Sequence, residues 1–166
     1  MKTPPFHPDE AERLQALRDL LILDTDPEDP FDAITVFCQS RFGVRTALVS
    51  LVDENRQWFK SARGLDVRET PRDISFCGHT ILGDGPLVVP DARRDQRFAD
   101  NPLVTGPPHI RFYAGAPLRL ENGMTVGTLC LIDPDPHTLQ PEDLRDLQDL
   151  AQTVVRELER RVSRVR

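Results

Sequence analysis

The amino-acid sequence predicts an α+β fold, in which one antiparallel sheet has the terminal helices on one face and an irregular segment on the other. Two observations lead to this prediction. Apolar residues recur with clear helical spacing near the two ends of the chain, whereas residues 46–133 contain several runs that alternate with a period of two. Tight turns join only neighbouring strands, which is the connection that antiparallel pairs allow.

Two helices are predicted before the first strand. Residues 9–23 place leucines at helical spacing and acidic side chains in the first turn, where the helix dipole favours them. Asp29 followed by Pro30 is typical of an N-cap and a first helical residue, so a second helix is expected there. Gly43 is expected to end this second helix.

The middle of the chain predicts short strands and one short helix. Residues 46–52 and 57–62 are expected to form a hairpin, because a polar turn cluster separates two alternating runs. Asp73 or Ser75 could cap a short helix that follows. Residues 87–90 are expected to form a short strand that finishes at its proline, which cannot donate to a sheet ladder.

A second hairpin is predicted near the end of the sheet. Residues 109–120 alternate most clearly, with one face buried and the other partly wet. Asn122-Gly123 favours a type I′ turn, because both residues tolerate positive φ angles. Residues 125–133 are apolar on both faces, with Val126 and Cys130 on the same one, so a central strand is expected.

The last predicted element is a long helix that begins at Pro141, with Leu139 and Leu144 at the positions of a hydrophobic staple. It has an apolar stripe made of Leu144, Leu147, Ala151, Val154, Leu158, Val162 and Val165. The stripe is longer than one domain needs, so we expect the helix to pack on the sheet up to Leu158 and to form a parallel homodimer through its last turns. The alternative is an exposed tail whose arginines suit the negative end of the helix dipole.

Composition excludes several classes of protein. The 166 residues fit one domain, and 39% apolar with 29% charged residues is typical of a globular chain. The net charge of −6 opposes binding to nucleic acid or to anionic membranes. No signal peptide or membrane-spanning run is present, so a cytoplasmic location is expected. The three cysteines show no CxxC spacing, so reduced thiols are expected, without a disulfide framework or a metal site.

Several ordered motifs together resemble a GAF domain. These motifs are Arg72-Asp-Ile-Ser-Phe-Cys-Gly-His-Thr-Ile, Val89-Pro-Asp, Asp95-Gln-Arg-Phe, Asn101-Pro-Leu-Val, Arg111-Phe-Tyr-Ala-Gly-Ala-Pro-Leu and Gly127-Thr-Leu-Cys-Leu-Ile-Asp. The resemblance covers residues 9–160, after an N-terminal tail at 1–8 and before the end of a signalling helix at 161–166. It is strongest to GAF domains that precede histidine kinase or diguanylate cyclase domains.

The resemblance implies a sheet of about six strands and a pocket for a small ligand, roofed by the segments between the third and fifth strands. It also implies a sensor that signals through its terminal helices, as in two-component systems, to a downstream kinase or cyclase. The ligand and any cofactor stay unidentified from the sequence. The Asn-Lys-Phe-Asp-Glu signature of the cyclic-nucleotide-binding relatives is absent.

Candidate ligand-binding residues cluster in the segment Phe76-Cys77-Gly78-His79-Thr80, which combines a thiol, an imidazole and a hydroxyl on one short helix. The competing interpretation is a capped helix that buries Phe76 and Cys77, because free cysteine usually behaves as a small hydrophobe. A catalytic pair of Cys77 and His79 is disfavoured, because residues two apart on a helix point about 200° from each other.

Further candidates lie in the following loop and strand. Asp91, Phe98 and Asn101 belong to a polar loop that could close over a site, although Asp and Asn beside proline also form local turns. Arg111 and Tyr113 share the less apolar strand face, where a guanidinium and a phenol could hold a polar ligand or make structural contacts.

The sequence therefore favours a non-catalytic sensor, with three alternatives. No carboxylate pair has a supporting nucleophile or metal cluster around it. Free methionine-R-sulfoxide reductases resemble GAF domains and have a cysteine near Cys77, but their Gly-His-Ile-Ala-Cys-Asp stretch is replaced by Ile110-Arg-Phe-Tyr-Ala-Gly here. A bilin photoreceptor often has its cysteine directly before a histidine, and here Gly78 separates the two. A ligand-free dimerisation domain is the third alternative.

Overall fold

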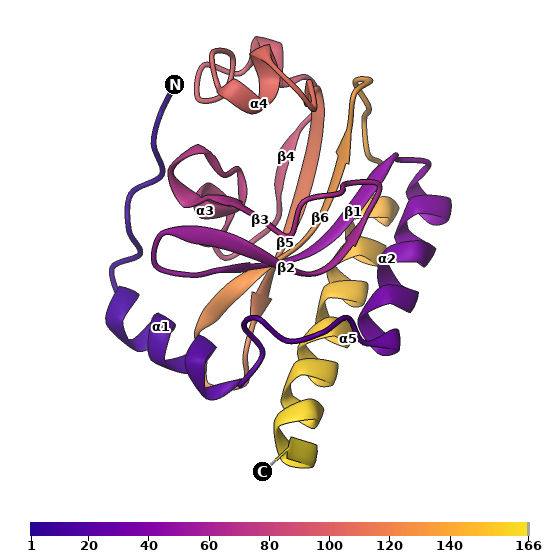
Figure 1. Ribbon diagram of the computed structural model, residues 1–166. Coiled ribbons are helices and arrows are strands. Elements are labelled where there is room, and N and C mark those ends of the chain that lie inside the picture. The colour runs from indigo at the N-terminus through magenta and orange to yellow at the C-terminus, as the bar shows by residue number, and fades with distance from the viewer. Residues whose placement is uncertain (166) are drawn as a thin grey trace.

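The computed structural model describes residues 1–165 of the chain. Within these residues the chain forms a six-stranded antiparallel sheet, in the strand order β3-β2-β1-β6-β5-β4 (Figure 1). In chain order the helices and strands are α1 (Glu10–Asp19), α2 (Asp29–Phe42), β1 (Thr46–Val52), β2 (Arg56–Arg63), β3 (Glu69–Pro71), α3 (Cys77–Thr80), β4 (Leu87–Val89), α4 (Pro102–Thr105), β5 (Phe112–Arg119), β6 (Thr125–Asp133) and α5 (Pro141–Val165).

An apolar layer covers each face of the sheet. Ala47, Val49 and Leu51 of β1 pack with apolar side chains of α1, α2 and α5. Leu48 and Val52 of the same strand point to the other face, where side chains of α3 and α4 pack. Figure 1 shows α2 and α5 side by side on one face, with α3 and α4 across the sheet from them. The predicted fold class, with its terminal helices on one face, is confirmed.

The N-terminal helices differ from prediction at their ends. The helix expected over residues 9–23 ends at Asp19, because Leu21 and Asp24 have positive φ angles of 54° and 62° that a helix cannot accommodate. The second helix begins at Asp29 itself, so the prediction of Asp29 as N-cap was off by one residue. Gly43 ends this helix in the left-handed conformation, as predicted.

Two strands also differ from prediction. The strand expected over 109–120 begins only at Phe112, because His109 has a φ of 57° and turns the chain. The face of this strand that contains Tyr113 was expected to be partly wet, yet Tyr113 is completely buried. β3 was not predicted, because its three residues are too short to show alternation.

The hairpin between β5 and β6 is built differently from the predicted type I′ turn. Of its two central residues only Gly123 has a positive φ, of 88°. The Gly123 amide donates to the Leu120 carbonyl and the Leu120 amide to the Met124 carbonyl, which defines a three-residue loop with glycine in the left-handed position. A register shift follows at Leu118/Arg119, and Val126 consequently packs on the helix-covered face rather than beside Cys130.

The C-terminal helix begins at Pro141 as predicted. It was expected to leave the domain after Leu158, but Arg161 is also buried and donates to the carbonyls of Leu20 and Leu21. The exposed part of the stripe is therefore shorter than expected and contains Val165, which is 51% exposed. Arg166, at the end of the predicted signalling segment, lies outside the described residues.

The segment between β2 and β5 covers the second face of the sheet. The segment on this face was expected to be irregular, but its residues 91–108 include α4 and a short 3-10 turn at Ala92–Arg94. Across residues 1–165, no helix combines the length and the apolar character needed to cross a membrane.

Candidate functional site

A cavity of about 270 Å³ lies between the sheet and the segment that covers its second face. Strands β1, β2, β5 and β6 form its floor, and the segment from β3 to β5 forms its roof. The lining residues are Thr46, Leu48, Gln57, Phe59, Leu65, Val67, Thr70, Phe76, Cys77, Leu103, Pro107, Pro108, Ile110, Tyr113, Cys130 and Ile132. A cavity closed by a loop-rich roof over a rigid sheet is the usual form of a small-molecule site.

Helix α3 and its N-cap residue Phe76 supply two lining residues, and neighbouring segments hold the helix. Ser75 Oγ accepts a hydrogen bond of 3.0 Å from the Gly78 amide and donates to the Arg72 carbonyl, so Ser75 rather than Asp73 supports the helix start. The Phe76 ring stacks on Phe98, with 4.0 Å between ring centroids. These contacts fix Phe76 and Cys77 against the cavity.

Cys77 lies in a compact group of buried polar side chains. Its Sγ lies 3.0 Å from Thr128 Oγ1, 3.4 Å from Tyr113 Oη and 3.9 Å from Cys130 Sγ. The Tyr113 hydroxyl also lies 2.7 Å from Thr80 Oγ1. Gly115 provides the space for the phenol, since an added Cβ there would lie 2.2 Å from Tyr113 Oη.

The environment alters the acidity of this group. Burial raises the pKa of the Cys77 thiol, but hydrogen bonds from Cys130, Thr128 and Tyr113 outweigh burial and lower the pKa to about 7. The hydrogen bond to Cys77 raises the pKa of Cys130 well above its usual range, and burial adds to this effect. Burial, with the nearby thiols, likewise raises the pKa of Tyr113.

Cys77 is an acidic thiol, but Cys77 and His79 do not form a pair. The Nε2 atom of His79 lies 3.0 Å from the Lys2 carbonyl oxygen, and its ring packs edge-on against Phe98. His79 does not line the cavity, whereas Cys77 does. A nucleophilic cysteine needs a base within hydrogen-bond reach, and among the described residues only hydroxyl groups and the Cys130 thiol hydrogen-bond Cys77.

Of the nine residues predicted to bind a ligand, three line the cavity: Phe76, Cys77 and Tyr113. The remaining six lie behind or beside it. They are His79, Thr80, Asp91, Phe98, Asn101 and Arg111.

Asn101 and Arg111 make contacts within the roof, whereas Asp91 forms a local turn. Asn101 caps α4 by accepting from the Leu103 amide at 2.9 Å, and its Nδ2 donates to the Ile74 carbonyl. Arg111 donates to the Val104 carbonyl at 2.8 Å. Asp91 accepts from the backbone amide and the guanidinium of Arg93, which makes it a turn residue as in the alternative interpretation.

Most lining residues were not predicted, although some could have been. Leu48, Cys130 and Ile132 lie on the alternate positions of β1 and β6 that face away from the helices. The period of two already separates these residues from the helix-covered face, so the alternation gave a usable signal. The roof residues Leu103 and Pro107 have no such pattern, because loop positions are set by tertiary contacts.

The N-terminal residues are bound against α3 and do not form a free tail. Pro4 is buried, and an added Cβ on Gly78 would lie 2.7 Å from its ring. The Lys2 amide donates to the Arg97 carbonyl, and its carbonyl contacts His79. Figure 1 shows this segment running alongside α3 to α1.

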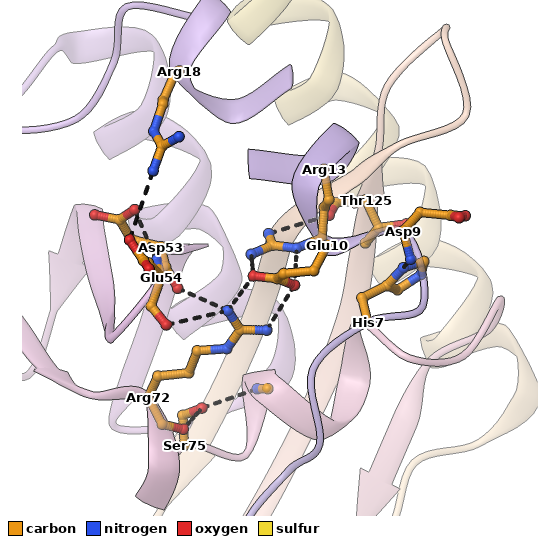
Figure 2. Close-up of polar contacts among 11 residues, drawn as sticks. His7, Asp9, Glu10, Arg13, Arg18, Asp53, Glu54, Arg72, Ser75 and Thr125 are labelled. Carbon is orange, nitrogen blue, oxygen red and sulfur yellow. Dashed lines mark hydrogen bonds and ion pairs between the residues drawn. The ribbon is translucent and has the colours of Figure 1, made fainter. Parts of the chain in front are cut away.

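A buried ion-pair cluster joins α1 to the segment that precedes α3 (Figure 2). The Glu10 carboxylate accepts from Arg72 at 2.6 and 3.1 Å and from Arg13 at 3.0 Å on each oxygen. Arg72 also donates to the carbonyls of Asp53 and Glu54. We call Glu10, Arg13 and Arg72 the N-terminal cluster.

A second cluster joins α5 to β2. Glu28 Oε2 accepts from Lys60 Nζ at 2.6 Å and from Arg161 Nε at 2.6 Å. Burial would raise the pKa of Glu28, but the hydrogen bonds from Lys60 and Arg161 lower it. Lys60 is adjacent in β2 to the lining residue Phe59, so this C-terminal cluster (Glu28, Lys60 and Arg161) begins at the cavity floor.

Comparison with known proteins gives one closely related curated sequence. The chain is 44% identical over 156 residues to a cyclic di-GMP phosphodiesterase of Pseudomonas aeruginosa. The alignment covers 93% of this chain but only 27% of that protein, so the chain spans about a quarter of the relative's length.

Solved structures share the fold. A free methionine-R-sulfoxide reductase from Neisseria meningitidis, in complex with its substrate, superposes with a TM-score of 0.65 at 18% identity, over 99% of this chain and 98% of that one. The GAF domain of PixJ from Thermosynechococcus elongatus, in its blue-light-absorbing form, gives a TM-score of 0.65 at 15% identity, over 89% of each chain. At these identities the similarity concerns the fold alone.

The sequence profile of the GAF domain matches residues 26–158, which is most of the chain. The sheet, the covering segment and the terminal helices described above agree with that match. The chain belongs to the GAF domain family.

Proposed function

We propose that this chain is a non-catalytic sensory domain that binds a small molecule in the cavity and transmits its state through the terminal helices. The observation that carries this proposal is the hydrogen-bonded path from the cavity to α1. Gly78, next to Cys77, donates to Ser75, which donates to the Arg72 carbonyl, and the Arg72 guanidinium binds Glu10 (Figure 2). A ligand that moves α3 therefore acts on α1 through short, buried contacts.

The C-terminal cluster supports the same proposal from the floor of the cavity. Phe59 lines the cavity, and Lys60 beside it is tied through Glu28 to Arg161 on α5. A ligand transmits a signal only if it binds two arrangements of the domain with different affinities. Both terminal helices are bonded to cavity walls, so a shift in either wall changes their relative positions.

We further propose that the domain regulates an enzymatic partner domain in the cytoplasm, in the manner of two-component and cyclic-nucleotide signalling proteins. The 44% identity to part of a cyclic di-GMP phosphodiesterase supports a role beside such an enzyme. Kinase and cyclase partners fit the same arrangement. The three cysteines are buried and free, which agrees with a reducing compartment.

Native mass spectrometry of the protein purified under mild conditions tests ligand binding. We expect a non-covalent adduct that disappears on denaturation. Removal of the adduct should then speed amide hydrogen exchange in α3 and in α1, because the N-terminal cluster links the two. An adduct whose removal changes exchange only around the cavity would contradict transmission to the helices.

One observation favours an enzyme as the second candidate. Cys77 has a pKa near 7, and a second thiol, Cys130, lies 3.9 Å away, as a thiol-based reductase would need. However, the lining contains no charged side chain to hold the ammonium and carboxylate of free methionine sulfoxide. Turnover of methionine sulfoxide with a thiol reductant, lost in Cys77→Ser, would replace the sensor proposal with this one.

We also propose a homodimer formed through the end of α5. Val165 is 51% exposed at the end of the apolar stripe, whereas Val162, one helical turn before it, still packs against the core. Sedimentation equilibrium should show a dimer that the exposed substitution Val165→Glu weakens without changing the melting temperature. Substitution of the exposed Val36 and Phe37 on α2 provides the control, and loss of the dimer there instead would place the interface on α2.

A further inference from the structure

The cavity lining contains no Asp, Glu, Lys, Arg or His side chain among its sixteen residues. The charged residues that the sequence suggested as ligand contacts, Asp91 and Arg111, point to local backbone groups instead. A charged ligand group would therefore lose its hydration without gaining an opposite charge. Transfer of an unpaired ion from water into an apolar site is strongly unfavourable.

The polar lining groups are already paired within the protein. Gln57 accepts from Ser50 at 3.0 Å and donates to Thr70 at 2.6 Å. Thr46 donates to the Gly64 carbonyl at 3.2 Å, and Tyr113 is bonded to Thr80. A ligand with many hydrogen-bonding groups would have to break these bonds, whereas an apolar ligand gains contact with Leu, Ile, Phe and Pro side chains.

The size of the cavity limits the ligand further. An apolar protein cavity of about 150 Å³ accommodates benzene. On the same scale, the cavity of about 270 Å³ accommodates roughly ten non-hydrogen atoms. Half-buried Leu65 and exposed Val67 belong to the lining, so the cavity has an apolar entrance on the side of the loop between β2 and β3.

We infer that the cavity selects a small, uncharged, mainly apolar molecule of about ten non-hydrogen atoms, such as a bicyclic aromatic compound. This inference rests on the proposed sensory function and narrows its ligand. It excludes cyclic di-GMP, whose two phosphates find no cation here, as the cavity ligand.

Naphthalene is a suitable neutral probe, and 1-naphthoate and 1-naphthylmethylammonium are its charged counterparts. Isothermal titration calorimetry measures the affinity of the protein for each of the three probes. The titration is made at pH 6, where the Cys77 thiol is mostly protonated. We expect naphthalene to bind and each charged probe to bind at least ~100-fold more weakly. Binding of either ion as tightly as naphthalene would overturn the inference.

Three cavity variants and one surface control locate the binding. Ile132→Phe fills the cavity from β6 and should weaken naphthalene binding at least ~10-fold, while Val36→Phe on the exposed face of α2 is the matched control. Leu103→Phe fills it from the roof, in case the first variant fails to fold. Leu65→Lys adds an ammonium at the entrance. It should therefore reduce the difference in affinity between 1-naphthoate and naphthalene.

The outcomes separate this inference from the proposed function. If naphthalene does not bind but a charged metabolite co-purifies and is displaced by Ile132→Phe, the apolar selection is wrong and the sensory function stands. If neither cavity-filling variant changes the binding of the probes or of a co-purified molecule, the cavity is not a ligand site and both proposals fail. Neutral-selective binding that both variants abolish supports the inference.

Discussion

Replacing Glu10 with alanine is expected to lower the free energy of unfolding by about 3–5 kcal/mol. Arg13 is 0% exposed and Arg72 is 4% exposed, and both direct two nitrogen atoms to this one carboxylate. Without Glu10 two buried guanidinium groups lose their only carboxylate partner among the described residues. The cost of an unpaired buried charge exceeds that of a lost surface ion pair several-fold.

Urea denaturation of the wild type and of Glu10→Ala measures this difference in the free energy of unfolding. Glu12→Ala is the matched control, because Glu12 is exposed in the same first turn of α1 and also interacts with the helix dipole. We expect Glu12→Ala to change the free energy of unfolding by less than about 0.5–1 kcal/mol. Equal effects of the two substitutions would show that the helix dipole, not the N-terminal cluster, makes Glu10 important.

The same carboxylate predicts a specific pH dependence. Burial would raise the pKa of Glu10, but hydrogen bonds and charge from Arg72 and Arg13 lower it from 4.5 to about 2. A lowered pKa in the folded state gives stability that is fully present above pH 4.5 and is lost as the pH falls towards 2. The stability difference between the wild type and Glu10→Gln should shrink across that range, whereas a constant difference would contradict the lowered pKa.

Replacing Glu28 with alanine is expected to lower the free energy of unfolding by about 2–3 kcal/mol. Lys60 is fully buried and loses its only carboxylate partner among residues 1–165, although it keeps Thr25 Oγ1 at 2.8 Å. Arg161 still donates to the carbonyls of Leu20 and Leu21, which directly follow α1. These remaining bonds explain why the expected loss is smaller than for Glu10.

This substitution also tests the link from the cavity to α5. Hydrogen exchange should rise in α5 around Arg161 and in β2 around Lys60, while α3 keeps its protection. Asp84→Ala is the control, since Asp84 is 95% exposed in its ion pair with Arg119 and should contribute less than about 1 kcal/mol. Unchanged exchange in α5 would mean that the C-terminal cluster does not hold the helix.

The cavity illustrates how far sequence reasoning extends to a site. Phe76, Cys77 and Tyr113 were identified from motifs and do line the cavity. Asp91 was a candidate as part of a polar loop and Arg111 as part of the less apolar strand face, but Asp91 binds Arg93 and Arg111 donates to the Val104 carbonyl. Local hydrogen bonds satisfy those side chains first, and nothing in the order of residues distinguishes a satisfied charge from a free one.

The N-terminal segment also shows that the sequence does not reveal which charged side chains of a helix are buried. The leucine spacing of residues 9–23 says nothing of Arg13, which is completely buried between Glu10 and the Thr125 carbonyl. Glu28 and Lys60 are 32 residues apart, and Glu28 and Arg161 are 133 residues apart. Such pairs depend on where the sheet brings distant elements together, which single-sequence periodicity does not encode.

The long C-terminal helix combines both kinds of information. Its start at Pro141 and its apolar stripe follow from local sequence, because proline favours the first helical turn and periodic leucines define a buried face. Where it leaves the domain was decided by tertiary structure, since Glu28 and two backbone carbonyls hold Arg161 beyond the last leucine. The sequence by itself thus determined the elements and the two faces of the sheet, through periods of 3.6 and 2. Only the tertiary structure decided which charges are buried, because burial depends on partners far apart in the chain.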